Sequence, residues 1–144
     1  VALFQDAEST VRTSAIDALT ATGEAAMPYV GTVAKLLRDE CCVVRVAAIQ
    51  AMGQLGGAAS AHVEAMAKLL RDENWQVRLF AVEAFGISGV GTAAAPFLGD
   101  IAALLESESW RGRLTAVEAL GRFGEMAADH VAAMAMLLRD EHEG

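Results

Sequence analysis

The chain has 144 residues, of which 54% are hydrophobic and only 6% aromatic, and its formal net charge is −8. This is enough apolar material for the core of one domain or a short repeat array, and the many alanines favour closely packed helices. The negative charge argues against general nucleic-acid binding and against docking on an anionic membrane, because both need lysine and arginine.

Two helical patterns alternate along the chain, and we call them the first and second helix of each pair. Pro28 and Pro96 fall at first turns of the first helix, where a missing N–H costs nothing. Asn74 and Ser109 are suitable N-caps for the second helix. In chain order, the predicted elements are the end of an earlier first helix at 1–5 and helices at 9–22, 27–38, 42–55, 61–71, 75–88, 95–106, 110–123 and 129–139. Each second helix is followed by a glycine that suits its C-terminus: Gly23, Gly56, Gly89 and Gly124.

Two sequence markers repeat with the same period. Leu-Leu-Arg-Asp-Glu begins at 36, 69 and 137, with Leu-Leu-Glu-Ser-Glu at 104; Val-Arg begins at 11, 44 and 77, with Gly-Arg at 112. Both markers recur every 33 residues with one spacing of 35, so a two-residue insertion lies between Gly89 and Phe97. The period predicts an all-α, right-handed solenoid of about four two-helix units. The single array over 1–144 divides into a partial unit at 1–23, full units at 24–56, 57–89 and 90–124, and a partial unit at 125–144.

The arginine of the second marker lies at the edge of the apolar arc of its helix. A guanidinium at that position must be paired or hydrogen-bonded. An aspartate stands six residues earlier in three copies, and Ser107 replaces it in the fourth. We predict that each arginine bonds an aspartate carboxylate from its own or a neighbouring turn, together with backbone carbonyls; a solvated surface arginine is the alternative. The residues of this predicted structural ladder are Asp6, Arg12, Asp39, Arg45, Asp72, Arg78 and Arg113.

These stretches, Leu36 to Glu40 and Val44 to Gly56 with their copies, resemble HEAT repeats, especially the short repeats of phycobilisome-lyase-like proteins. The resemblance covers essentially the whole chain. The Thr-Pro-Leu-His signature of ankyrin repeats and the tetratricopeptide pattern are absent. Three departures, namely Ser107, Gly112 and the insertion, make the third interface between units the least regular.

The resemblance implies that the second helices line a concave face on which a partner binds. Comparison of the copies shows a constant apolar arc and a variable opposite arc, as expected of a scaffold with a customised surface. Leu79, Phe80 and Ile87 would form an apolar patch rimmed by charge; the alternative is that Leu79 and Phe80 pack against neighbouring units. The candidate partner-binding residues are Gln50, Gln54, Gln76, Leu79, Phe80, Glu83, Ile87, Arg111, Leu114, Glu118 and Arg122.

Little in the sequence points to catalysis. The three histidines have no evident partner, and His62 and His130 share a slot with aromatic residues, which favours packing. The iron-binding His-Glu pairs of deoxyhypusine hydroxylase, another HEAT-like protein, are missing after each Val-Arg. A bilin-lyase-like enzyme that uses Cys41 or Cys42 is the remaining catalytic alternative. We expect no enzyme activity, no cofactor and no metal.

Other features of the sequence concern its cysteines, tryptophans and start. Cys41 and Cys42 are adjacent, which predicts free thiols in a reducing compartment and thus an intracellular, cytoplasmic protein, with an organelle as the alternative. Trp75 and Trp110 share a slot; we favour a role in covering the turn over one as interface anchors. The chain starts with Val1 in mid-unit and has no signal-peptide pattern, so we expect the array to continue upstream.

The leading function is a scaffold or adaptor that binds another protein or peptide. We expect no nucleic acid and no membrane insertion, since no apolar run approaches the roughly 20 residues that span a bilayer. Uncapped terminal repeats predict possible end-to-end self-association. The main alternative is a structural subunit buried in a large multisubunit complex.

Overall fold

The computed structural model describes residues 2–86 and 91–140, and within this part every regular element is a helix. The second helices are α1 (Ser9–Thr20), α3 (Cys42–Leu55), α5 (Trp75–Gly86) and α7 (Trp110–Phe123). The first helices are shorter in their α-helical part: α2 (Val30–Lys35), α4 (Val63–Lys68), α6 (Leu98–Ala103) and α8 (Val131–Asp140). A 3₁₀ segment, η1 (Ala2–Gln5), precedes α1.

The first helices differ from the sequence prediction of continuous α-helices. Each begins with a seven-residue 3₁₀ segment: η2 (Gly23–Tyr29), η4 (Gly56–His62), η6 (Gly91–Phe97) and η8 (Gly124–His130). Three of them also end in one: η3 (Leu36–Arg38), η5 (Leu69–Arg71) and η7 (Leu104–Glu106). Pro28 and Pro96 therefore lie inside 3₁₀ segments. The tighter 3₁₀ winding is a usual way to satisfy the free backbone groups at helix ends.

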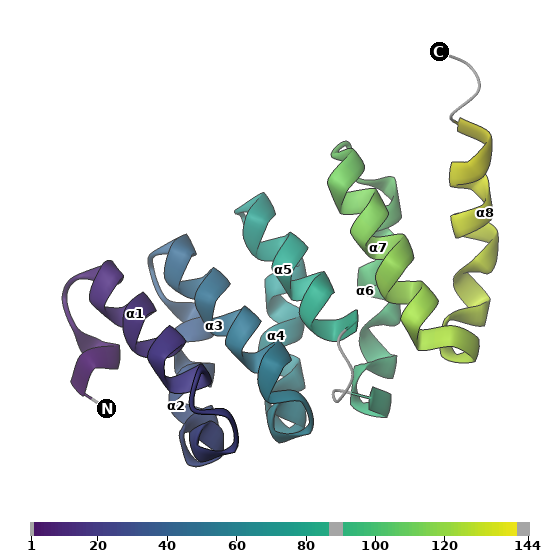
Figure 1. The fold of residues 1–144 in the computed structure, drawn as a ribbon. Coiled ribbons are helices and arrows are strands. Elements are labelled where there is room, and N and C mark those ends of the chain that lie inside the picture. The colour runs from purple at the N-terminus through teal and green to yellow at the C-terminus, as the bar shows by residue number, and fades with distance from the viewer. Residues whose placement is uncertain (1, 87–90, 141–144) are drawn as a thin grey trace.

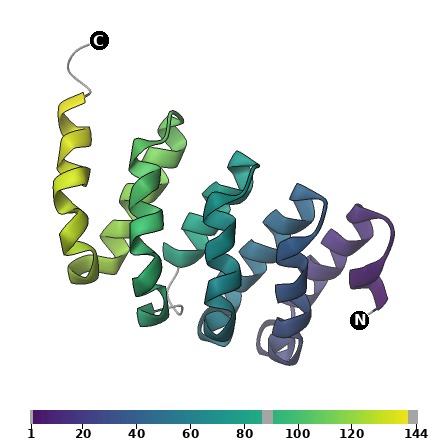
Figure 2. The same cartoon turned by 180° about the vertical axis from the view of Figure 1, so that it is seen from behind.

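The helices form two layers, each in chain order. Figure 1 shows α1, α3, α5 and α7 side by side in one layer, and Figure 2 shows the first helices in the other. Each second helix packs directly on the next one, α1 on α3, α3 on α5 and α5 on α7. This arrangement of repeated helix pairs confirms the predicted all-α solenoid.

The core is a continuous apolar seam between the two layers. Side chains at equivalent repeat positions fill it, as the spacing of the sequence markers requires. Ile16, Ile49 and Val82 from the second helices are at most 1% exposed. Leu37 and Leu70 in the 3₁₀ ends of the first helices are at most 2% exposed. Since no unit could bury this surface by itself, stacking of the units stabilises the fold.

Glycines end the second helices where the chain turns into the next layer. Gly23, Gly56 and Gly124 have φ angles of 62°, 54° and 54°, a region that other residues rarely adopt. Gly89, the fourth predicted glycine, lies outside the described residues. Asn74 caps α5, since its Oδ1 accepts hydrogen bonds from the N–H groups of Gln76 and Val77; Ser109 occupies the same position in α7 but makes no such bond.

One segment of the described chain is long and apolar enough to cross a membrane. It runs over residues 42–71 with a mean hydropathy of 1.2, and half of its most apolar stretch is buried inside the protein. In the structure this segment is not one straight rod, because α3 ends at Leu55 and the chain turns at Gly56 into α4 of the other layer. Its apolar side chains belong to the seam between the layers.

Candidate functional site

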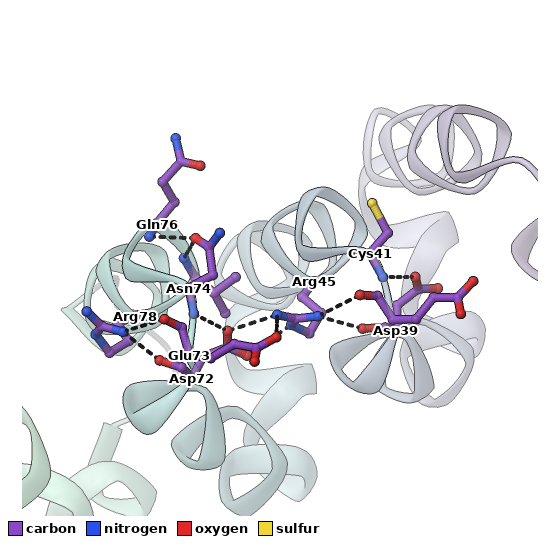
Figure 3. A network of polar contacts seen from close by, with 10 residues as sticks. Asp39, Cys41, Arg45, Asp72, Glu73, Asn74, Gln76 and Arg78 are labelled. Atoms are coloured by element: carbon purple, nitrogen blue, oxygen red, sulfur yellow. Dashed lines mark hydrogen bonds and ion pairs between the residues drawn. The ribbon is translucent and has the colours of Figure 1, made fainter.

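The turns between the two helices of each pair are linked by arginines. Arg45 of α3 donates through Nη1 to the carbonyl oxygens of Asp39 and Glu40, at 2.8 and 3.1 Å. Its Nε and Nη2 donate to the two carboxylate oxygens of Asp72 in the next turn, both at 2.9 Å. Figure 3 shows Arg45 between these two turns. The fork–fork geometry fixes both turns relative to each other, because the guanidinium is planar and rigid.

The same arrangement occurs one unit earlier. Arg12 donates to the carbonyl oxygens of Asp6 and Ala7 and to both carboxylate oxygens of Asp39, at 2.7 to 3.0 Å. Of the two sources considered from the sequence, the carboxylate therefore comes from the neighbouring turn. The Asp6 carboxylate accepts a bond from the N–H of Glu8 instead. Arg12 and Arg45 are 6% and 7% exposed, so they are buried and not solvated surface residues.

Asp39 has its pKa lowered by this environment. Burial acts to raise the pKa, but the bonds from Arg12 and from the N–H of Cys41, with the charges of Arg12 and Arg45, outweigh it. The pKa values of Arg12 and Arg45 are raised, chiefly by their bonds to Asp39 and Asp72. The Arg12–Asp39 pair is thus held in its charged form at neutral pH.

The third turn departs from this pattern, as Ser107 suggests. Arg78 keeps the carbonyl contacts of its own turn, to Asp72 and Glu73, but among the described side chains no carboxylate accepts a bond from it. The predicted carboxylate partner of Arg78 is therefore missing, because Ser107, which has no carboxylate, occupies the position of the aspartate. Arg113 likewise donates to the carbonyls of Ser107 and Glu108; the aspartate of the next turn is Asp140, whose side chain is not described.

The candidate partner-binding residues fall into three groups in the structure. Leu79 and Phe80 are only half-buried, and Phe80 packs against the core cluster. For Phe80 this favours the alternative interpretation, packing between units, over an open apolar patch. Ile87 lies outside the described residues. The exposed members are Gln50, Gln54, Gln76, Glu83, Arg111, Leu114, Glu118 and Arg122.

A groove between α5 and α7 gathers three of the exposed charged residues. Glu83, Glu118 and Arg122 line it together with Gly86, Thr115 and Ala119, and we call it the α5–α7 groove. Its floor is narrow at Gly86, where an added Cβ would lie 3.3 Å from the Cα of Ala119. Arg122 donates through Nη1 to the carbonyl oxygen of Gly86 at 3.2 Å and so bridges the two helices.

The electrostatics of the α5–α7 groove favour a cation. Burial raises the pKa of Glu83, the nearby charge of Glu118 raises it further, and Arg122 opposes both. Two carboxylates and one guanidinium leave the groove with net negative charge. A lysine or arginine side chain placed beside Glu83 and Glu118 would relieve their repulsion. Among the described residues, no group of three or more His, Cys, Asp or Glu side chains is placed to hold a metal ion.

The close approach at Gly86 was not predicted from the sequence. The available signal was a glycine inside a helical pattern, since Gly53, Gly86 and Gly121 share one repeat position. Sequence periodicity could not distinguish Gly86 from Gly121, although an added Cβ at Gly121 would meet nothing within 4 Å. The difference arises because α7 packs on α5 at Gly86, whereas no further second helix is described after α7.

Trp75 and Trp110 are 46% and 60% exposed. This degree of exposure disfavours the role in covering the turn that we preferred, and it favours the alternative of anchors at the turn edge. The Arg111 guanidinium carbon lies 5.1 Å from the centre of the Trp110 ring, within the range of a cation–π contact. The Trp110 ring therefore keeps an open surface next to a positive charge.

Cys41 and Cys42 are free, half-buried thiols. Cys41 is the N-cap residue of α3, and the N–H groups of Val43 and Val44 lower its pKa by hydrogen bonding to the sulfur. No neighbouring histidine or metal site accompanies it among the described residues. The described structure therefore gives no further support to a bilin-lyase-like role of this thiol.

Comparison with known proteins identifies a family and several solved structures with a similar fold. A family model described as HEAT repeats matches residues 30–103 and, in an overlapping match, residues 64–144. An engineered protein whose crystal structure was determined by the Northeast Structural Genomics Consortium is similar over 92% of this chain, with a TM-score of 0.71 and 19% sequence identity. This chain spans 64% of that protein's length. No curated protein sequence matches.

Proposed function

This chain belongs to the HEAT-repeat family, and from that premise we propose that it is a scaffold that binds another protein through its second-helix layer. HEAT repeats are commonly protein-interaction scaffolds. The observation that carries the finer proposal is the α5–α7 groove, with Glu83, Glu118 and Arg122 on one exposed face. The partner we propose is a protein segment with a lysine or arginine that enters this groove.

The position of the second helices supports their use as the binding face. They pack directly on one another along the whole row. In a curved stack, the layer whose neighbours approach most closely lies on the inner side, which is why we place these helices on the concave face. A concave face lets one extended segment contact several units at once, so modest contacts from each unit add up.

Charge explains why a basic segment is the partner that fits best. The chain has a net charge of −8, so a cationic segment would be steered towards it at low ionic strength. Within the groove, a partner cation would pair with carboxylates that now repel each other. Both effects weaken with added salt. We therefore propose salt-sensitive binding without catalysis, in keeping with a family that is typically non-enzymatic.

The test is an affinity capture with quantitative mass spectrometry. The double variant Glu83→Gln/Glu118→Gln removes the negative charge and nearly preserves side-chain shape. We expect partner affinity to fall about tenfold, since 1.4 kcal/mol corresponds to one such factor. A substitution at Phe80 would be less suitable, because Phe80 packs on the core.

The matched control is Glu64→Gln/Glu125→Gln. It changes the net charge by the same amount, but at exposed positions in α4 and η8. The control should keep the partner with little change in affinity. If the groove variant captured the partner as well as the wild type, the groove would not be the binding site. If the control lost as much affinity as the groove variant, the effect would come from net charge alone.

A further inference from the structure

Arg78 holds its guanidinium in the same way as the paired arginines, but no described side chain accepts a bond from its other edge. Its Nη1 lies 2.7 and 3.0 Å from the carbonyl oxygens of Asp72 and Glu73. In Arg45 the equivalent distances are 2.8 and 3.1 Å. Since these two bonds orient a rigid, planar group, the Nε–Nη2 edge of Arg78 faces the place that a carboxylate occupies in the other turns.

At that place the structure has a pocket, which we call the Arg78 pocket. Ser107 and Ser109 line it on the side of α7, together with Gly112. Trp75, Leu79 and Leu104 supply apolar walls. Ser107 does not fill this space, because its side chain is shorter than that of aspartate and carries no charge. Its Oγ accepts a hydrogen bond from the Ser109 N–H at 3.3 Å.

Loss of the partner leaves Arg78 more accessible than its equivalents. Arg12 and Arg45 are buried, whereas Arg78 is half-buried. Gly112 replaces the valine found at the same position in the three preceding copies, and an added Cβ there would lie 2.8 Å from Ser107 Oγ. Both replacements therefore fall on the same pocket. A guanidinium with two oriented, free donors beside an apolar wall is a good receptor for an anion with a carbon skeleton.

We propose that the Arg78 pocket binds the carboxylate of an aspartate or glutamate side chain from a partner protein, in the place of the missing aspartate. The paired turns provide the template, because the same edge of Arg12 and Arg45 holds a carboxylate by two bonds of 2.8 to 2.9 Å. A phosphate fits less well, since Arg78 is the one cation among the residues lining the pocket, and Glu73 and Glu108 lie in the flanking turns. A monoanion is therefore the better match.

That the carboxylate comes from a partner protein rests on the proposed function. The pocket itself is independent of that function. Thr115 lines both the Arg78 pocket and the α5–α7 groove. Arg78 and Glu83 are five residues apart on α5, which is about 7.5 Å along a helix axis. A partner that uses both sites would present an acidic and a basic side chain about that far apart.

The experiment uses NMR of the Arg78 Nε–Hε group, with propionate as the probe for an acidic side chain. Propionate should move the chemical shift of this signal saturably towards the values of the paired Arg12 and Arg45. Neutral propionamide should not do so, nor should a chloride salt at the same ionic strength as the propionate. In Ser107→Asp the signal should lie at the paired position from the start and no longer respond. Absence of a saturable shift in the wild type, or an unchanged response in Ser107→Asp, would overturn the proposal.

A second variant keeps the test decisive if Ser107→Asp folds poorly. Asp72→Ser copies the gap one unit earlier, so Arg45 should acquire the same response to propionate. Two short peptides distinguish a side-chain carboxylate from a C-terminal carboxylate as the bound group. Acetyl-Gly-Glu-Gly-amide carries only a side-chain carboxylate, and acetyl-Gly-Gln-Gly with a free C-terminus carries only a terminal one. A response to the first supports the proposal, and a response to the second alone overturns it. None of these measurements involves Glu83 or Glu118, so failure here and failure of the groove proposal are distinguishable.

Discussion

The first two interfaces between second helices, α1–α3 and α3–α5, differ from the third, α5–α7, in how their turns are joined. In the first two, a buried arginine joins the carbonyls of one turn to the carboxylate of the next. In the third, Ser107 replaces the aspartate and Arg78 keeps only its backbone contacts among the described residues. The exposed ion pair of Arg71 with Asp100 crosses this part of the chain, but such surface pairs contribute little.

The difference shows where this repeat array is specialised. Both pockets described above lie at the α5–α7 interface, where the regular joint is absent. The regular interfaces carry the same buried residues in the same places, which is what stability requires. A site for a partner needs exposed donors and acceptors, and the array provides them by omitting one aspartate.

The largest expected effect breaks a regular joint. Arg45→Met leaves the Asp72 carboxylate buried without its partner, and we expect it to lower the free energy of unfolding by about 3 kcal/mol. Arg78→Met removes only neutral carbonyl bonds and should cost about 1 kcal/mol. Urea unfolding followed by circular dichroism measures both. Equal losses in the two variants would show that the carboxylate contributes nothing to the joint.

Next in size is the repair of the irregular joint. Ser107→Asp supplies the missing carboxylate to Arg78, and we expect it to raise the free energy of unfolding by about 1.5 to 2 kcal/mol, the lower part of the range for a hydrogen bond to a charged group. The control is Ser60→Asp, which adds the same charge at an exposed position in η4, away from the Arg78 pocket. The same urea titration serves here. A larger gain in the control than in Ser107→Asp would contradict the pairing rule.

A smaller effect tests the close approach of α5 and α7 in the third interface, with the exposed Gly121 of α7 as the matched position outside it. Gly121→Ala should raise the free energy of unfolding by up to about 1 kcal/mol, because alanine favours a helix interior and nothing lies within 4 Å of the new Cβ. Gly86→Ala should lose this gain, since its Cβ would meet the Ala119 backbone at 3.3 Å. Thermal melts of the two variants give the difference. Similar stabilisation by both would mean that α5 and α7 separate easily.

The smallest effect is a dependence of stability on pH. The pKa of Asp39 in the folded state lies below its unfolded value of about 3.9, so its contribution is present above that pH and is lost as pH falls through the folded pKa. Glu83 has the opposite sign: its raised pKa gives a contribution that is present below about pH 4.3 and is lost as pH rises through the folded pKa.

Urea midpoints between pH 3 and 7 separate the two regions. Asp39→Asn should flatten the loss of stability at acid pH. Glu83→Gln should remove the fall in stability that accompanies rising pH on the mildly acidic side. An unchanged acid side in Asp39→Asn would show that the first joint does not respond to pH.

The repeat made much of this fold predictable from sequence. The predicted helix at 42–55 and the one at 110–123 have the bounds of α3 and α7 in the structure, because caps, apolar spacing and terminal glycines all agree there. The 3₁₀ segments of the first helices were not predicted, since periodicity over a few residues does not separate 3₁₀ from α winding.

The candidate site was less predictable, for a reason of geometry. That Arg45 and Asp72 belong to one ladder follows from their spacing, but the choice of the neighbouring turn depends on the offset between units, which no local pattern encodes. The half-burial of Phe80 and the narrow floor at Gly86 likewise depend on how closely neighbouring units pack. Sequence comparison between the copies did locate the irregular interface, through Ser107 and Gly112.

Each charged link of the regular joints connects residues only 27 positions apart in the chain. No part of the array has to find a distant part during folding, so we expect rapid, zipper-like folding that can begin in any unit. Because each link joins neighbouring units only, the number of units in the chain can change. Insertion or removal of one complete 33-residue period would leave every other joint with its partner at the same separation, so recombination could lengthen or shorten such a protein without redesigning its interior.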